Sequence, residues 1–263
     1  MLNISQLSQT LLLPLIGRAN SNLISDIEAR RIVDIYLNEL SKFFKYCNGK
    51  YSLIWQARAL FFDSEIQEYL KLKTNATIVN LGAGLDTTFY RVNNDKIHWV
   101  DLDLPEVINI RKNLLTQNEH IHNISCSILE FDAWITQLKT TPDIFFAGGL
   151  LFYFTKQEVK KILEIITTKF PKAIILFDSI SFKQKQKTIK RLNKMNLPVS
   201  IGWTLDSITE IQELRSKYTI TKLPYFYKLK YFKQASILQK YTMHINDLFN
   251  KSGFVKLTRK NVL

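Results

Sequence analysis

"NLGAGLDTTFYR", residues 80–91, follows directly after an apolar run at 76–79. It contains Gly82 and Gly84, in a chain that has only eight glycines among its 263 residues. Because glycine has no Cβ, the backbone can turn sharply at such positions and a ligand can approach it closely. We therefore interpret this stretch as a ligand-binding turn at the end of a buried strand.

The segments around this turn alternate between short apolar runs and amphipathic stretches. Such alternation predicts an α/β fold, a mostly parallel sheet with helices on both faces. Strands are expected at 76–81, 97–102, 122–128, 143–150 and 173–179, with the clearest helices between them at 105–117 and 156–170. The C-terminal stretches 217–232 and 253–263 are expected to add strands at one edge of the sheet.

The whole chain, 1–263, is expected to form a single domain. Apolar residues at three- and four-residue spacing predict helices over 22–46 and 52–72, ahead of the first strand. The chain then divides into an N-terminal helical cap (1–74), a ligand-binding core (75–180), a lid insertion (181–216) and a C-terminal sheet edge (217–263).

The composition indicates a folded, globular chain, with 46% hydrophobic and 22% charged residues. Its two cysteines, Cys47 and Cys126, cannot build a disulfide framework and suit a reducing compartment. The apolar segment 10–17 is interrupted by Pro14 and is shorter than the roughly 20 residues that a membrane span needs. We expect a cytoplasmic protein that does not enter a membrane.

The net charge of +13 leaves two interpretations open. The densest basic run is FKQKQKTIKRLNK, residues 182–194, whose cations fall around much of a predicted helix. No aromatic residue is interleaved between these cations for base stacking. The run fits a solvated helix or a surface that meets an anionic partner or substrate, so charge alone does not identify the function.

The turn at 80–91 fits a dinucleotide poorly. Pyrophosphate-binding turns have a third glycine, as in G-x-G-x-x-G, whereas this chain has Thr87 at that position. Asp86 would also repel a pyrophosphate. S-adenosylmethionine (SAM) is a cationic sulfonium that carries an amino acid and an adenosine, and it tolerates an acidic residue better. The residues therefore favour SAM over NAD.

Carboxylates suited to ribose hydroxyls end the second predicted strand. Asp101 and Asp103 are two residues apart, so their side chains are expected to point the same way. Asp103 could instead cap the helix that begins after Leu104. Gly148 and Gly149 end the fourth strand at the same edge of the sheet, where open parallel sheets bind their ligands.

Several longer stretches carry a family resemblance: NLGAGLDTTFYR, WVDLDLPEVINIRKNL, FFAGGLLFYFTKQEVKKIL and ILFDSIS, with TLLLPLIGRANSNLISDIEARRIV before them and IGWTLDSITEIQEL after them. Together they resemble the leucine carboxyl methyltransferase family, and more closely its bacterial branch of polyketide-type (tetracenomycin-type) O-methyltransferases. The resemblance covers roughly residues 10–215. It implies the class I SAM-dependent methyltransferase (Rossmann-like) fold, a seven-stranded sheet in which the last strand runs antiparallel.

The resemblance also implies which residues bind SAM. An arginine of the family pairs with the carboxylate of SAM, and a planar guanidinium can grip a carboxylate at two points. The implied contacts are Gly82, Ala83 and Gly84 for the methionine part, Arg58 for its carboxylate, Asp103 or Asp101 for the ribose, Ser127 and Ile128 for adenine, and Arg18 to help close the site.

One position departs from the family pattern. The family commonly has alanine, glutamate and glycine after the fourth strand, whereas this chain has Ala147, Gly148 and Gly149. The family glutamate would touch the amino group of SAM. Asp86 could supply that charge here, or binding could be weaker.

An O-methyltransferase that acts on a carboxyl or hydroxyl oxygen of a small molecule is the function that the resemblance implies. The acceptor could be polyketide-like or another carboxylate, and it could be anionic. Tyr153 and Trp203 are candidates to line its pocket, and no general base stands out. No metal is expected, because the histidines lack partners at metal-ligand spacing.

Two other functions stay open. A nucleic-acid methyltransferase could use the positive charge, but amino-methylating enzymes that act on bases usually have an Asn/Asp-Pro-Pro-Tyr/Phe motif after the fourth strand. AGGLLFYF, residues 147–154, contains no proline. A SAM-binding interaction protein without catalysis is the second alternative, and the missing glutamate keeps it open. The sequence does not determine the oligomeric state.

Overall fold

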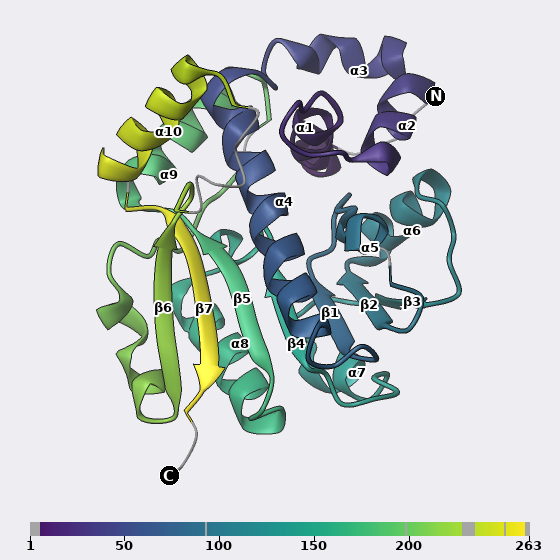
Figure 1. Ribbon diagram of the computed structural model, residues 1–263, viewed down its shortest axis with the longest axis vertical. Helices are drawn as coiled ribbons and strands as arrows, with labels where there is room; N and C mark the ends of the chain where they lie inside the picture. Colours follow the sequence, from purple (N-terminus) through teal and green to yellow (C-terminus); the bar gives the residue numbers. More distant parts are fainter. Residues whose placement is uncertain (1–5, 93, 198, 228–234, 250, 261–263) are drawn as a thin grey trace.

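A seven-stranded sheet runs through the protein in the order β3-β2-β1-β4-β5-β7-β6 (Figure 1). The computed structural model describes residues 6–92, 94–197, 199–227, 235–249 and 251–260. The strands are β1 Thr77–Leu81, β2 His98–Asp103, β3 Ile121–Ser125, β4 Ile144–Ala147, β5 Ile174–Ser179, β6 Tyr218–Pro224 and β7 Gly253–Arg259.

Strand direction follows the predicted pattern. Strands β1 to β5 pair in parallel, and β7 lies antiparallel between β5 and β6. The prediction of a mostly parallel sheet whose last strand is antiparallel is therefore confirmed. Because all five parallel strands end at the same edge, the turns that follow them are brought together there.

Helices cover both faces of the sheet and one of its ends (Figure 1). The α-helices are α1 Gln6–Ala19, α2 Ile27–Ile35, α3 Leu37–Phe44, α4 Gly49–Leu70, α5 Thr88–Val92, α6 Pro105–Leu114, α7 Phe131–Ile135, α8 Lys156–Lys169, α9 Phe182–Asn193 and α10 Ile237–Phe249. Two 3-10 helices are η1 Leu151–Tyr153 and η2 Ile208–Ser216.

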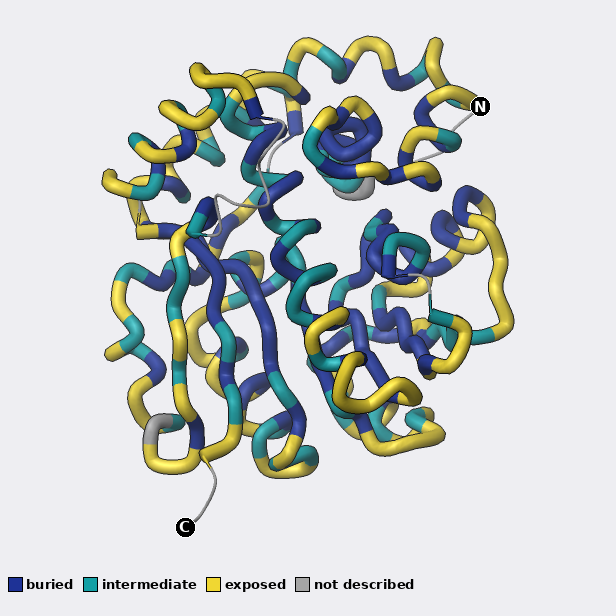
Figure 2. The backbone as a smooth tube through the Cα atoms, in the orientation of Figure 1, coloured by how far each residue is buried: buried dark blue, intermediate teal, exposed yellow. Residues whose placement is uncertain are grey.

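The central strands are buried on both faces (Figure 2). Side chains alternate across the sheet, so Val79 packs in one core cluster with Ile162 of α8, and Ile78 packs in another with Phe62 of α4. This double burial explains why the strands are continuous apolar runs rather than alternating ones.

A third apolar cluster joins the N-terminal helices to two later elements. It contains the fully buried side chains of Leu15 of α1, Ile32 of α2 and Leu40 of α3. Leu114 of α6 and Leu192 of α9 are buried in the same cluster. The cap and the helix of the predicted lid segment therefore share one core. In Figure 1, α1, α2 and α3 lie at one end of the sheet.

The single helix predicted over 22–46 is wrong, because two helices occupy this range. Helix α2 begins after Asp26, whose carboxylate accepts a hydrogen bond from the Ala29 N–H. It ends at Tyr36, whose φ of −109° lies outside the helical range, and α3 starts at the next residue. Apolar spacing continues across this break, so the period of the sequence does not reveal it.

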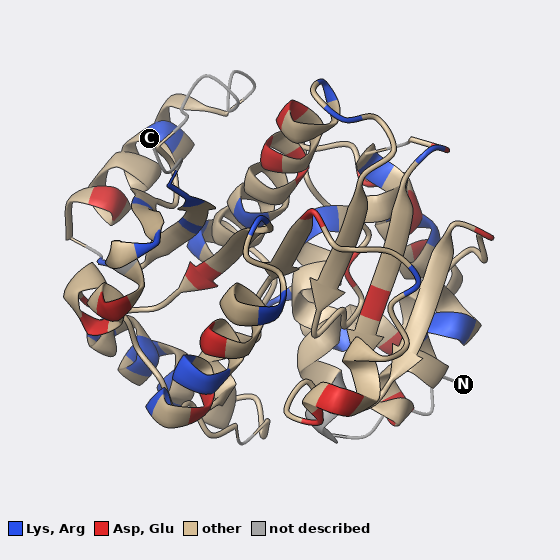
Figure 3. Cartoon of the chain, turned by 90° about the horizontal axis from the view of Figure 1, so that it is seen from below, with Lys and Arg blue, Asp and Glu red and all other residues tan. Residues whose placement is uncertain are grey.

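Basic residues are spread over many elements (Figure 3). The densest run forms α9, on which Lys183, Lys187 and Lys190 are exposed. Among the described residues, no helix combines the length and the apolar character needed to cross a bilayer.

Candidate functional site

A cavity of about 580 Å³ lies at the carboxyl ends of the parallel strands. Its wall includes the turns after β1, β2, β3 and β4, the end of β5, and residues from α1, α4, α6 and α9. Asp101 and Trp203 do not line it. The sequence-predicted residues that do line it are Arg18, Arg58, Gly82, Ala83, Gly84, Asp86, Asp103, Ser127, Ile128, Gly148 and Tyr153.

The turn after β1 depends on its two glycines. Gly82 and Gly84 have φ values of +63° and +47°, in the left-handed region that side chains disfavour. A Cβ on Gly82 would lie 2.5 Å from Cδ1 of Leu150. The N–H of Gly82 donates to the Leu102 carbonyl at 2.8 Å, so the turn is fastened to the end of β2.

Arg111 of α6 holds the same turn from behind. Its Nη1 donates to the carbonyl oxygens of Ala83 at 3.2 Å, Gly84 at 2.8 Å and Asp86 at 3.0 Å. The residue is buried, so these carbonyls bond to protein rather than to solvent. Sequence reasoning missed Arg111, because its only signal was one cation on the buried face of a predicted helix.

Asp101 and Asp103 have different surroundings although they share a face of β2. Asp101 is fully buried and accepts hydrogen bonds from Arg111, from Trp99 Nε1 at 2.9 Å and from Asn80 Nδ2 at 3.1 Å. Asp101 lies two residues before Asp103 in β2, and Arg111 covers its carboxylate. Of the two carboxylates, Asp103 is the one that lines the cavity.

Asp103 is held by backbone amides. Its Oδ2 accepts from the Gly84 N–H and its Oδ1 from the Leu104 N–H, both at 2.7 Å. Burial raises the pKa of Asp103, and the two amides act in the opposite direction. Each carboxylate oxygen keeps a second lone pair that can accept from a ligand hydroxyl.

The turn after β3 supplies an apolar wall with fixed backbone. The Ser127 N–H donates to Glu130 Oε2 at 2.9 Å, and Trp134 Nε1 donates to the Ile128 carbonyl at 3.0 Å. Ile128 is buried and lines the cavity beside Val107 of α6. This part of the cavity suits a flat, largely apolar group.

Arg58 of α4 meets the end of β5 across the cavity wall. Its Nη1 lies 3.3 Å from Asp178 Oδ2, and Asp178 Oδ1 accepts from the Gly149 N–H at 2.6 Å. A Cβ on Gly149 would lie 2.3 Å from Arg58 Nη1, so the glycine lets the guanidinium approach the backbone. Sequence reasoning missed Asp178, although it ends a predicted strand at this edge.

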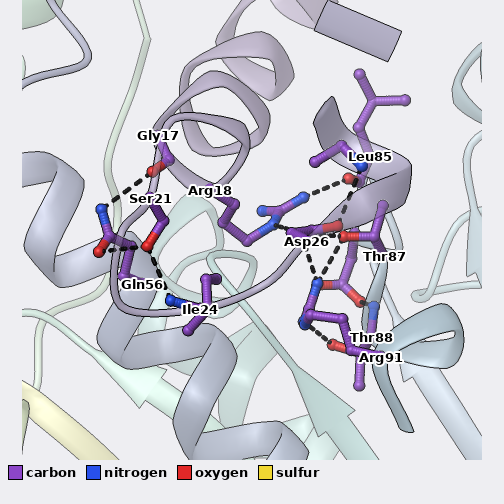
Figure 4. Close-up of polar contacts among 12 residues, drawn as sticks. Gly17, Arg18, Ser21, Ile24, Asp26, Gln56, Leu85, Thr87, Thr88 and Arg91 are labelled. Carbon is purple, nitrogen blue, oxygen red and sulfur yellow. Dashed lines mark hydrogen bonds and ion pairs between the residues drawn. The ribbon is translucent and has the colours of Figure 1, made fainter. Parts of the chain in front are cut away.

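A buried carboxylate joins the cap to the turn after β1 (Figure 4). Asp26 accepts from Arg18 Nε at 2.9 Å, from Arg91 Nη1 at 2.8 Å and from the Thr87 hydroxyl at 2.6 Å. Arg18 also donates to the Leu85 carbonyl at 2.7 Å. Arg18 lines the cavity, but two of its nitrogens are thus committed to protein partners.

Charge pairing favours the ionised form of two acids of this region, Asp26 and Asp86. Burial alone would raise the pKa of Asp26, but the charges of Arg18 and Arg91, together with the hydrogen bonds from Thr87 and the Ala29 N–H, hold that pKa below its ordinary value. Burial would also raise the pKa of Asp86, but Arg91 and Arg18, together with hydrogen bonds from Thr88, lower it. Arg91 also pairs with Asp63 of α4 at 2.7 Å, which extends the network to a third helix.

Comparison with known proteins decides the family. A model of the leucine carboxyl methyltransferase family matches residues 14–167, more than half of the chain. The chain belongs to the leucine carboxyl methyltransferase family. A curated member, the tetracenomycin polyketide synthesis O-methyltransferase TcmP of Streptomyces glaucescens, is 26% identical over 124 residues. That match covers 47% of this chain and 46% of TcmP, so it spans about half the length of this relative.

Solved structures show the methyltransferase fold over most of the chain. A crystal structure of a candidate methyltransferase from Thermobifida fusca superposes with a TM-score of 0.63 at 10% identity and covers 96% of this chain and 94% of its own. Magnesium protoporphyrin IX methyltransferase from Synechocystis, solved with bound S-adenosylhomocysteine (SAH), has a TM-score of 0.50 at 10% identity, with 88% and 100% covered. Both structural similarities are evidence for the fold alone.

Gly148, where the chain departs from the family pattern, lies in a position with little room for a side chain. A Cβ at this position would lie 2.9 Å from Cε2 of Phe62 and 3.6 Å from Cδ of Arg58. A family-like glutamate would therefore need the Phe62 ring to move. The aromatic ring and the glycine fit each other, which makes the departure part of the packing of this cavity.

Tyr153 and Trp203, the two residues expected to line the acceptor pocket, have different positions. Tyr153 is 38% exposed and lines the cavity, where burial raises the pKa of its phenol and the opposing effect of Arg58 is smaller. Trp203 is 4% exposed and packs against Phe177 in the core, with ring centroids 6.1 Å apart. The lid segment instead faces the cavity through α9 and through Val199 and Ser200.

Within the described part of the chain, no group of three or more His, Cys, Asp or Glu side chains could hold a metal ion.

Replacing Asp26 by asparagine is expected to lower the free energy of unfolding by about 3–5 kcal/mol, because two buried guanidinium groups would lose their shared charge partner. Urea unfolding monitored by circular dichroism measures this change. Asp34→Asn is the matched control, since Asp34 lies exposed on α2, the helix that Asp26 caps, and should change stability by less than about 0.5 kcal/mol.

The difference in unfolding free energy between the native protein and Asp26→Asn is also expected to depend on pH. Because the folded-state pKa of Asp26 is lowered, its stabilising charge is present above the unfolded-state pKa of about 4 and is lost as the pH falls. The gap in unfolding free energy should therefore narrow in acid below that pH. A gap that stays constant from neutral pH into acid would contradict the role of the Asp26 charge.

Proposed function

We propose that this protein is a SAM-dependent O-methyltransferase that acts on a carboxyl or hydroxyl oxygen of a small molecule. The observation that carries this proposal is the combination of the left-handed glycine turn after β1 with the cavity-facing carboxylate of Asp103 at the end of β2. Membership of the leucine carboxyl methyltransferase family supports the reaction class, and the matched part of TcmP supports an oxygen acceptor.

The donor set of the cavity fits SAM. Backbone groups at Gly82–Gly84, which line the cavity, would lie against the methionine part. Asp103 would accept the ribose hydroxyls through its free lone pairs. The apolar wall at Ile128 would take the adenine ring, with Ser127 beside it.

Arg58 and Asp178 would hold the two charges of the amino acid part. Arg58 has a hydrogen bond to Asp178 and, among the described residues, to no other group, so its remaining N–H groups can grip a carboxylate. Asp178 lies beside Gly149 and would replace the missing family glutamate next to an ammonium group. Asp86 is less suited, because its carboxylate accepts from the Thr88 N–H and lies near Arg18 and Arg91.

The residues near the acceptor need to position an oxygen and exclude water. Bound SAM supplies an electrophilic methyl group. Burial raises the pKa of the Tyr153 phenol, so this side chain would donate a hydrogen bond to the acceptor rather than act as a base. A carboxylate acceptor needs no base, because it is already anionic.

Calorimetric titration with SAM and with SAH, and with NADH in parallel, tests the cofactor. We expect micromolar binding of SAM and SAH and no heat from NADH. No binding of SAM or SAH would overturn the proposal. Binding of SAM without methyl transfer to any acceptor in a broad screen of phenols and carboxylic acids would favour a non-catalytic interaction protein instead.

Asp103→Asn is expected to weaken SAH binding about 10- to 100-fold, because hydrogen bonds to a charged acceptor are lost or turned into weaker ones. Calorimetry measures the dissociation constant. Asp132→Asn, an exposed position on α7, is the control and should leave SAH affinity unchanged. An unchanged affinity for Asp103→Asn would remove Asp103 from the ribose site.

A further inference from the structure

The cavity extends beyond the strand turns to a wall formed by two helices. This wall contains no residue of the proposed cofactor contacts. It combines aromatic and aliphatic side chains with one cation: Tyr51, Ile54 and Trp55 of α4, and Thr188, Arg191 and Leu192 of α9.

Arg191 rests on the aromatic part of this wall. Its guanidinium carbon lies 3.8 Å from the ring centroid of Tyr51 and 5.1 Å from that of Trp55. Its Nη2 donates to the main-chain carbonyl of Tyr46. Stacking on two rings and one hydrogen bond fix the plane of the guanidinium while leaving its other N–H groups for a ligand.

Arg191 differs from the other arginines of the cavity in its charge balance. Arg18 is paired with Asp26 and Arg58 with Asp178, at 2.9 Å and 3.3 Å. No carboxylate of the described residues pairs with Arg191, and the ionisable groups that act on it are Tyr51 and Cys47. Burial lowers the pKa of Arg191, yet a guanidinium stays charged at neutral pH. A partly buried cation without a counter-ion favours an anionic ligand.

We propose that Arg191 binds an anionic group, a carboxylate or its equivalent, on a methyl acceptor whose body is aromatic or otherwise apolar and flat. This inference rests on the proposed function, since it assigns the part of the cavity that the cofactor does not use. The apolar surfaces of Ile54, Trp55 and Leu192 would contact the body of the acceptor, and the guanidinium would select for its charge. Arg191 is thus a specificity-determining residue supplied by the lid segment.

The test uses 2-naphthoate and its neutral isostere 2-naphthamide as probes, titrated by calorimetry into the SAH-saturated full chain. The native protein should bind the carboxylate about 10-fold or more tightly than the amide, as a charge-assisted pair predicts. Arg191→Gln should reduce this preference to below about 3-fold and leave the amide affinity unchanged. Lys190→Gln, which removes a charge from an exposed neighbour on α9, should keep the native preference.

Each other outcome overturns the inference. A native protein without a preference for the carboxylate has no anion site at Arg191, and a preference that survives Arg191→Gln places that site elsewhere. Titration of SAH alone separates this failure from failure of the cofactor assignment, because Arg191→Gln should bind SAH as the native protein does. If Arg191→Gln does not fold, Arg191→Lys retains the charge but loses the planar stack, and its preference should fall to an intermediate value.

Discussion

The shape of the cavity depends on one buried carboxylate, that of Asp26. Two guanidinium groups and a hydroxyl share it, and each comes from a different place in the chain: Arg18 at the end of α1, Arg91 in α5 and Thr87 after the glycine turn. Removing one member of such a set leaves the others charged and buried, which costs more than the set contributes when complete. A shift of the cap away from the turn would therefore expose or unpair these charges.

The turn after β1 is similarly fixed from the opposite side by Arg111. This arginine bonds three turn carbonyls and is itself balanced by Asp101. The two aspartates of β2 thus have separate tasks that follow from their depth in the strand. Asp101 neutralises the cation that shapes the turn, and Asp103 presents its carboxylate to the cavity while its oxygens anchor the Gly84 and Leu104 amides. A ligand-facing group and its structural support are therefore encoded two residues apart.

The sequence predicts those features whose signals are local. Strand positions, the parallel order and the need for Gly82 and Gly84 follow from apolar runs and glycine placement. The position of Trp203 could not be predicted, because an aromatic residue in a lid segment can face either a ligand or the core. In the structure, Trp203 packs against Phe177 in the core. Arg191 was visible only as part of a basic run, since its two aromatic contacts come from a helix about 140 residues earlier in the chain. Contacts of this range depend on tertiary packing, for which one sequence has no periodic signal.

The glycine at position 148 illustrates how a departure from a family pattern can be compensated by neighbours. A glutamate there would place a carboxylate near Arg58, and in this chain Asp178 already occupies that role at the end of the adjacent strand. Two carboxylates against one arginine would repel each other and would raise the cost of burying both. With Phe62 filling the space beside Gly148, the cavity keeps a single carboxylate and a single guanidinium at this point. The zwitterionic amino acid group of the proposed cofactor would match that pair of opposite charges, with β5 rather than the turn after β4 supplying the acid.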